Sequence, residues 1–144
     1  MATVAIGDVA IGDIRGNLSA LEELLAKVMP TKGHDDVLVF VGDYIDRGPD
    51  PRGCLDRIVR LKEQAKCAFV TLLGNNEDWM LRTLRDPTRH SWILGTEAFE
   101  TIASYSVHVA DTLHRELERA GARLITETVR LSFEVFLASC RRST

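Results

Sequence analysis

Three short apolar runs that alternate with amphipathic helical patterns constrain the fold of this chain more than any other feature. The runs read as strands at Val9–Ile11, Val37–Val41 and Cys67–Leu72. An apolar stripe at helical spacing, with Leu18, Leu21, Leu25 and Val28, predicts a first helix. A second helix is predicted at Pro51–Gln64, and a third that starts at Glu77. The resulting order, βαβαβα, predicts an α/β fold in which right-handed crossovers connect the strands of a parallel sheet.

Two of these elements carry further signals. Residues Val37–Val41 are all apolar and mostly β-branched or aromatic, which is typical of a strand in a parallel sheet covered on both faces. The first helix carries a capping-box pattern between Ser19 and Glu22, and we expect it to stop at Pro30.

The second half of the chain shows helical patterns and no further clear strand. Residues 97–104 and 107–120 are predicted to be helical, with Gly121 as the C-cap. Residues 124–136 alternate only loosely and fit a strand or a helix, and the final residues read as a tail. We therefore predict one domain over residues 1–144, made of a motif-bearing core at 1–90 and a helical extension and tail at 91–144.

A repeated pentapeptide leaves two candidates for the first strand. Residues Val4–Asp8 recur without change as Val9–Asp13. Side chains on a strand alternate faces, so a shift of five residues turns every side chain over, and one continuous strand cannot present both copies alike. We predict that Val9–Asp13 forms the strand that carries the site. The first copy would be an extension, a bulge or a frayed end, and slippage between the two registers is an alternative.

Composition excludes several classes of protein. The net charge is −3 and the pI is about 5.8, which argues against a general nucleic-acid binder. No apolar run approaches the roughly 20 residues needed to span a bilayer, and the start lacks the features of a secretory signal. The 3 cysteines form no CxxC pair, which fits a reducing compartment. We expect a cytoplasmic protein that binds neither nucleic acid nor membrane.

Each predicted strand ends in a glycine-containing polar turn. The turns read GDIRGN, GDYIDRG and GNNED, and Asp13, Asp43 and Asn75 follow the first glycine of each, 30 and 32 residues apart. Ligands of open α/β sheets bind at the carboxyl ends of the strands, and carboxylate and amide oxygens suit hard cations such as Mn, Mg or Fe. Asp13, Asp43 and Asp46 would repel one another without a cation. A single Gly-Asp pair is more often a turn or a cap, but three in succession favour a metal site.

The three turns resemble the motifs of the calcineurin-like metallophosphoesterases, GD-x-HG(N), GD-x-x-DRG and GNHE. Their order and spacing are similar to the bacterial branch that holds Ser/Thr protein phosphatases and symmetrical diadenosine tetraphosphatases. GDYIDRGPD is a near-perfect match. The resemblance covers residues 1 to about 90, the N-terminal half of the two-sheet family fold. By this resemblance the chain is expected to be truncated, and to form a half-sheet of that sandwich.

The resemblance implies a function and a role for each site residue. In the family, two divalent metals of the Mn or Fe type activate a water that attacks a phosphate in line. Asp13 would bind the first metal, Asp43 would bridge both metals and Asn75 would bind the second. Arg47 would grip the phosphate, and Asp46 would orient the general-acid histidine of GNHE. The implied activity is metal-dependent hydrolysis of a phosphoprotein or a nucleotide phosphate ester, as in the Ser/Thr phosphoprotein phosphatases.

The chain departs from the family pattern at the residues that carry the chemistry. Arg15 stands where the first motif has a metal-binding histidine, and Asn76 stands where GNHE has the general acid. The histidine ligands that the family places in its second half lie past this length. We therefore expect one metal or none, and weak activity or none. The alternatives are a weakened hydrolase, a phosphate-binding pseudo-enzyme, and a structural remnant that self-associates to cover an incomplete sheet.

Arg15 itself has two interpretations. Its guanidinium either lies among Asp13, Asp43 and Asp46, supplying the positive charge that metals would otherwise supply, or points into solvent. A distance of more than about 6 Å from all three carboxylates would exclude the first interpretation.

Overall fold

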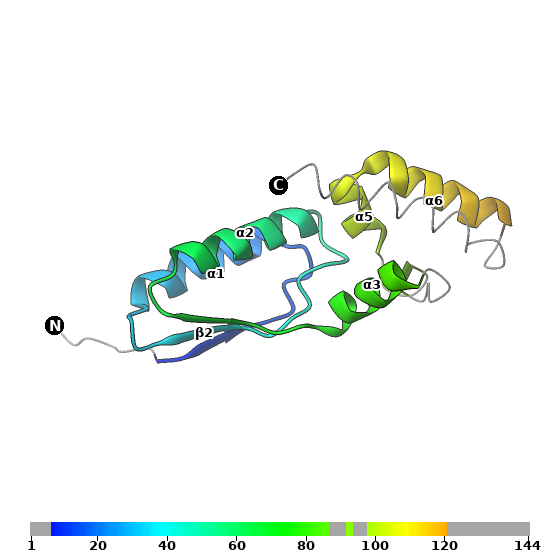
Figure 1. Cartoon of the computed structure of the whole chain (residues 1–144). Coiled ribbons are helices and arrows are strands. Elements are labelled where there is room, and N and C mark those ends of the chain that lie inside the picture. The colour runs from blue at the N-terminus through cyan, green and yellow to red at the C-terminus, as the bar shows by residue number, and fades with distance from the viewer. Residues whose placement is uncertain (1–6, 87–91, 94–97, 121–144) are drawn as a thin grey trace.

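The computed structural model describes residues 7–86, 92–93 and 98–120. In this part of the chain strands and helices alternate as predicted (Figure 1). The elements are β1 (Val9–Ile11), α1 (Leu18–Val28), the 3₁₀ turn η1 (Met29–Thr31), β2 (Val37–Phe40), α2 (Pro51–Gln64), β3 (Ala68–Thr71), α3 (Asn75–Arg85), α5 (Phe99–Tyr105) and α6 (Val107–Ala120). The α/β fold class is therefore confirmed. No helix in these ranges is long and apolar enough to cross a bilayer.

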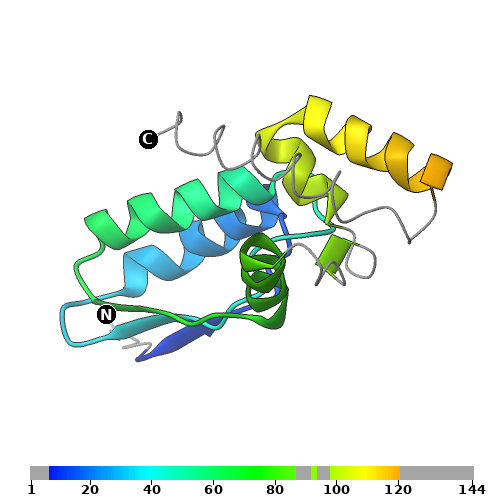
Figure 2. The same ribbon diagram turned by 45° about the vertical axis from the view of Figure 1, so that its right-hand side comes forward.

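The sheet is parallel, with strand order β1-β2-β3. Because both crossovers step in the same direction and right-handed connections are the rule, α1 and α2 lie on the same face of the sheet (Figure 2). Burial along β2 alternates, with Leu38 and Phe40 buried and their neighbours half-buried, and most of β3 is exposed. The expectation that β2 is covered on both faces is wrong for the described residues, because neither crossover helix lies on the second face.

The first strand starts at the second copy of the repeat. β1 begins at Val9, and its first residue pairs with Leu38 of β2. Asp8 lies just before the strand, and its carboxylate accepts a hydrogen bond from the Val37 N–H at 2.9 Å. The prediction that the second copy forms the first strand is confirmed. Most of the first copy lies outside the described residues.

Helix α1 starts differently from the sequence pattern. Its N-cap is Asn17, whose side chain accepts a hydrogen bond from the Ala20 N–H at 3.1 Å. The Ser19 hydroxyl donates to the same Asn17 oxygen at 3.0 Å, so the predicted capping box from Ser19 is wrong. Asn17 is the cap because the turn at Gly16, with a φ of 67°, places Asn17 directly before Leu18, the first residue of the helix. The helix ends at Val28, just before the turn that contains Pro30, as expected.

Helix α2 follows directly from the second polar turn. Asp50 is its N-cap and accepts a hydrogen bond from the Gly53 N–H at 2.8 Å, and Pro51 occupies the first helical position. These two signals fix where the helix begins, and therefore where the preceding turn must end. The turn that carries Asp43, Asp46 and Arg47 is thus held between β2 and a capped helix.

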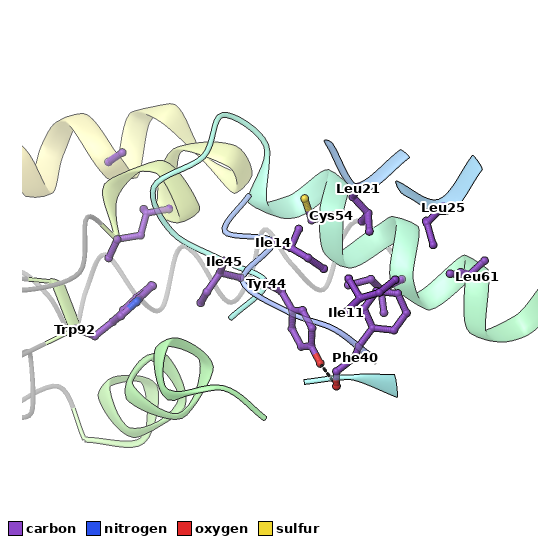
Figure 3. Close-up of a cluster of buried hydrophobic side chains, with 14 of the residues drawn as sticks. Ile11, Ile14, Leu21, Leu25, Phe40, Tyr44, Ile45, Cys54, Leu61 and Trp92 are labelled. Atoms are coloured by element: carbon purple, nitrogen blue, oxygen red, sulfur yellow. Dashed lines mark hydrogen bonds between the residues drawn. The ribbon is translucent and has the colours of Figure 1, made fainter. Parts of the chain in front are cut away.

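The core lies between the sheet and the two helices on its covered face. The Phe40 ring stacks on Phe69 at a centroid distance of 5.3 Å, and Leu21 and Leu25 of α1 pack into the same cluster (Figure 3). Buried Cys54 of α2 belongs to this cluster, and its burial raises the pKa of the thiol to about 11. Cys54 is therefore a neutral packing residue at physiological pH.

The later helices begin close to their expected positions. Helix α3 starts at Asn75, two residues before the predicted Glu77, because the Glu77 carboxylate turns back to the Gly74 N–H at 3.0 Å. Helices α5 and α6 match the two helical patterns predicted at residues 97–104 and 107–120. The predicted C-cap at Gly121 and the undecided segment 124–136 lie outside the described residues.

Candidate active site

Backbone hydrogen bonds join the first and second polar turns at the carboxyl ends of the strands. The Arg15 N–H donates to the Asp43 carbonyl at 2.9 Å, and the Gly16 N–H donates to the Tyr44 carbonyl at 2.8 Å. Glycine is required at Gly42, where φ is 100° and a Cβ would collide with the backbone of Gly74 in the third turn. The three turns therefore meet at one edge of the sheet.

Non-glycine residues with positive φ concentrate at the motif positions. Such a conformation is uncommon outside glycine and costs on the order of 1–3 kcal/mol for each residue. It persists only where the surroundings impose it, and such positions cluster at functional sites. The five residues and their φ values are Asp13 at 51°, Arg15 at 46°, Asp43 at 57°, Asp46 at 70° and Arg47 at 65°.

The buried carboxylate of Glu77 holds the second turn, in which Asp43 has a positive φ. Its Oε1 accepts hydrogen bonds from the N–H groups of Tyr44 at 2.8 Å and Ile45 at 3.2 Å. Its Oε2 accepts from the Asp43 N–H at 2.8 Å and the Gly74 N–H at 3.0 Å. One side chain of α3 thus satisfies four backbone donors of two turns. The sequence pattern gave no sign of this role, because three of the four donors lie 32 to 34 residues before Glu77.

Arg15 lies between two of the three predicted acidic residues. Its Nε and Nη2 lie 2.9 Å and 2.7 Å from Asp13 Oδ1, and its Nη2 lies 3.6 Å from Asp43 Oδ2. The hydrogen bond to Asp13 raises the pKa of the guanidinium, partly offset by desolvation, and the charges of Asp13 and Asp43 raise it further. The interpretation that Arg15 points into solvent is wrong. The positive charge lies where the acidic turns converge.

Asp46 has different partners from those expected. Its side chain is fully buried, its Oδ2 accepts a hydrogen bond from Trp92 Nε1 at 2.8 Å, and its Oδ1 accepts one from the Thr101 hydroxyl at 2.6 Å. The Asp46 N–H donates to the same hydroxyl at 2.9 Å. Arg15 pairs with Asp13 and Asp43, so the expectation that it also neutralises Asp46 finds no support in this geometry.

The sequence model of the calcineurin-like phosphoesterases matches residues 6–128, which include all three turns. The chain belongs to the calcineurin-like phosphoesterase family. The match extends past the motifs into α5 and α6, so the family likeness includes the helices that supply Thr101. The predicted family, and the fold expected from it, are confirmed.

Curated members of the phosphoesterase family are similar to this chain. A zinc-dependent endopolyphosphatase of Saccharomyces cerevisiae is 29% identical over 85 residues, which are 59% of this chain and 25% of that protein. A symmetrical bis(5'-nucleosyl)-tetraphosphatase of Ralstonia nicotianae is 38% identical over 81 residues, 56% of this chain and 26% of that protein. The serine/threonine-protein phosphatase 1 of Salmonella typhimurium is 33% identical over 104 residues, 72% of this chain and 45% of that protein. The matches thus span between a quarter and a half of these relatives.

The third turn adds an amide to the cluster. The end of the Asn75 side chain that faces Asp43 lies 3.1 Å from its Oδ1 and 3.3 Å from its Oδ2. With nitrogen inward, Asn75 donates to the Asp43 carboxylate; with oxygen inward, two acceptors meet and a cation between them is needed. Oxygen donors on Asp13, Asp43 and Asn75 fit one hard divalent ion.

A second metal ion fits this set less well. Within the described ranges no group of three or more His, Cys, Asp and Glu side chains is arranged to hold a metal. At the two positions where the family motifs carry histidine, this chain places a guanidinium, at Arg15, and an amide, at Asn76. Asn76 is buried, and its N–H donates to Asp43 Oδ1 at 3.5 Å. Neither position therefore supplies the imidazole nitrogen that the family motifs carry there, and at the first of them Arg15 brings a positive charge instead.

Proposed function

We propose that this chain carries a metal-dependent phosphoester hydrolase site that acts weakly on nucleotide phosphate esters or phosphoproteins. The observation that supports this most is the surroundings of the Asp43 carboxylate, with the Asn75 amide 3.1 Å away and Arg15 Nη2 3.6 Å away. An amide and a positive charge thus converge on one carboxylate at the carboxyl edge of a parallel sheet. The names of the bacterial relatives support the two substrate classes.

Each residue of the site would have a definite role. Asp13, Asp43 and Asn75 would hold a divalent metal of the Mn or Fe type. When bound, such an ion supplies Lewis-acid stabilisation and lowers the pKa of a water that can attack phosphorus. Arg47, exposed after the second strand, would bind the phosphate oxygens with its planar guanidinium. Asn76 cannot transfer a proton to the leaving group, which costs about 10²- to 10⁴-fold in rate.

Arg15 would weaken the site by competing with the metal. A unit charge about 4 Å from a cation opposes its binding by roughly 4 kcal/mol for each unit of that cation's charge, at an effective dielectric constant near 20. Metal binding would therefore require the guanidinium to leave Asp43, and the protein without metal would keep its acidic turns neutralised.

A metal titration tests this site directly. Calorimetric titration of the metal-stripped protein with Mn²⁺ should show saturable binding that disappears in Asp43→Asn, because both Asn75 and Arg15 face that carboxylate. Asp56→Asn, which removes an exposed carboxylate of α2, should bind Mn²⁺ like the wild type. Equal binding by the wild type and Asp43→Asn would place the metal elsewhere and contradict the assignment.

A second candidate function is phosphate binding without metal. Arg15 supports it, because a positive charge already lies at the acidic turns in the absence of a metal. It predicts that inorganic phosphate binds equally well with and without a chelator, and that Arg47→Ala abolishes binding while Arg60→Ala does not. Phosphate binding that requires Mn²⁺ would favour the hydrolase instead.

The remaining proposals concern the setting of the protein. We propose that residues 1–144 form one domain in the cytoplasm, and that copies associate through the exposed side of the sheet. The exposed apolar side chains near β3 support association, and they include Val70, Leu72 and Leu73. Sedimentation velocity tests this, since a monomer at high concentration would contradict it.

A further inference from the structure

The turn that carries Arg47 is held by residues that the family motifs do not contain. The Gly48 N–H donates to the Asp46 carbonyl at 2.7 Å and closes a three-residue turn around Arg47. Both Asp46 and Arg47 have positive φ, at 70° and 65°. A strained turn of this kind keeps its shape only if the groups around it hold it.

Those groups come from beyond residue 90. Trp92 and Thr101 are both fully buried, and together they make the three hydrogen bonds to the Asp46 side chain and N–H described above. Trp92 lies at the end of the hydrophobic cluster opposite Leu25 and Leu61 (Figure 3). A buried carboxylate is tolerated only when its oxygens are hydrogen-bonded, so the two side chains and Asp46 depend on one another.

A second contact fixes α5 against the same region. The guanidinium carbon of Arg52, in the first turn of α2, lies 5.3 Å from the ring centroid of Tyr105, the last residue of α5. The segment from Asp46 to Arg52 is therefore attached to α5 at both ends, by Thr101 at one end and by Tyr105 at the other.

We propose that Trp92 and Thr101 are positioning residues for the Asp46–Arg47 turn, so that the docking of α5 sets the geometry with which Arg47 receives phosphate. This inference rests on the proposed phosphate-binding role of Arg47. It assigns to the helical segment after the motifs a part in the site itself. Asp46 then serves as the link between α5 and the arginine, through its side chain on one side and its peptide bond on the other.

Two conservative variants test the inference. Trp92→Phe removes the indole N–H and keeps an aromatic ring, and Thr101→Val removes the hydroxyl at nearly constant shape. Hydrogen exchange followed by NMR should show the amides of Asp46 and Gly48 losing protection by about tenfold or more, as expected when buried polar groups lose their partners. The amides of β2 should keep their protection. Affinity for inorganic phosphate, with Mn²⁺ present, should fall by about tenfold or more in the same variants.

Matched controls separate positioning from general damage. Trp79→Phe changes the exposed tryptophan of α3, and Thr112→Val removes a hydroxyl that is hydrogen-bonded to His108 and Arg115 of its own helix, α6. Neither should alter exchange at residues 46–48 or phosphate affinity. Thr101→Ser keeps the hydroxyl and should behave like the wild type. A loss of binding in Thr101→Val alone would then be due to the missing hydroxyl, since a substitution that keeps it has no effect.

The outcomes distinguish the inference from the function on which it rests. Unchanged exchange at residues 46–48 in both variants, or unchanged phosphate affinity despite faster exchange, would overturn the inference and leave the hydrolase proposal intact. Faster exchange in the variants of a protein that binds no phosphate would support positioning of the turn and contradict the role proposed for Arg47.

Discussion

Replacing Glu77 with alanine is expected to destabilise the protein by about 3 kcal/mol or more in urea unfolding. The substitution leaves four backbone N–H groups, at Asp43, Tyr44, Ile45 and Gly74, without their acceptor. Each unsatisfied buried donor costs about 1–3 kcal/mol, and water entering the space offsets part of the sum. The second and third turns are held together by this one carboxylate, so the loss should also disorder the edge of the sheet that carries the proposed metal site.

Two further variants define the cause of that effect. Glu77→Gln keeps the shape and one acceptor oxygen, so it should cost about half as much, because an amide nitrogen then faces two of the donors. Glu63→Ala removes an exposed carboxylate near the end of α2 and should change the free energy of unfolding by less than about 0.5 kcal/mol. A Glu77→Ala protein as stable as Glu63→Ala would contradict the role given to this side chain.

Replacing Arg15 with histidine should raise the affinity for Mn²⁺ by about 100- to 1,000-fold. The change removes a charge that opposes the metal by roughly 4 kcal/mol per unit of metal charge, and it adds a neutral nitrogen ligand beside Asp13 and Asp43. Only part of the repulsion is recovered, because the flexible arginine of the wild type can turn into solvent when a metal arrives. Calorimetric titration of the metal-stripped proteins measures the difference.

The control for this variant is another arginine replaced by histidine. Arg60 lies on the exposed face of α2, and its Nε donates to the Asp56 carbonyl of its own helix. Arg60→His should bind Mn²⁺ like the wild type. If Arg15→His also left the affinity unchanged, the guanidinium between Asp13 and Asp43 would not be what limits metal binding.

Much of the fold could be predicted because local patterns determine it. Alternating apolar runs and helical stripes predicted the α/β order. The position of the second VAIGD copy directly before the Gly16-Asn17 turn predicted that β1 lies in that copy. The placement of both crossover helices on one face of the sheet was not predicted, because it depends on the direction in which successive crossovers step. The cap at Asn17 was misassigned to Ser19, since both residue types form caps and only the turn at Gly16 decides between them.

The site was predictable to the extent that its residues stand next to strand ends. Asp13, Asp43 and Asn75 follow three strands, and the charge of Arg15 indicated its acidic partners correctly for two of the three. Trp92 and Thr101 gave no comparable signal, since each is an ordinary core residue in sequence and contacts Asp46 across 46 and 55 positions. Pairings over such separations are set by tertiary packing, which local patterns do not encode.

The central claim, a weak metal-dependent phosphoester hydrolase site, is tested most directly by measuring the initial rate of para-nitrophenyl phosphate hydrolysis. The metal-stripped protein should be assayed with and without added Mn²⁺, beside Asp43→Asn purified in the same way. The account predicts a slow rate that appears only with Mn²⁺ and is lost in Asp43→Asn. A rate that persists in Asp43→Asn, or no rate above the buffer blank at any Mn²⁺ concentration, would contradict it.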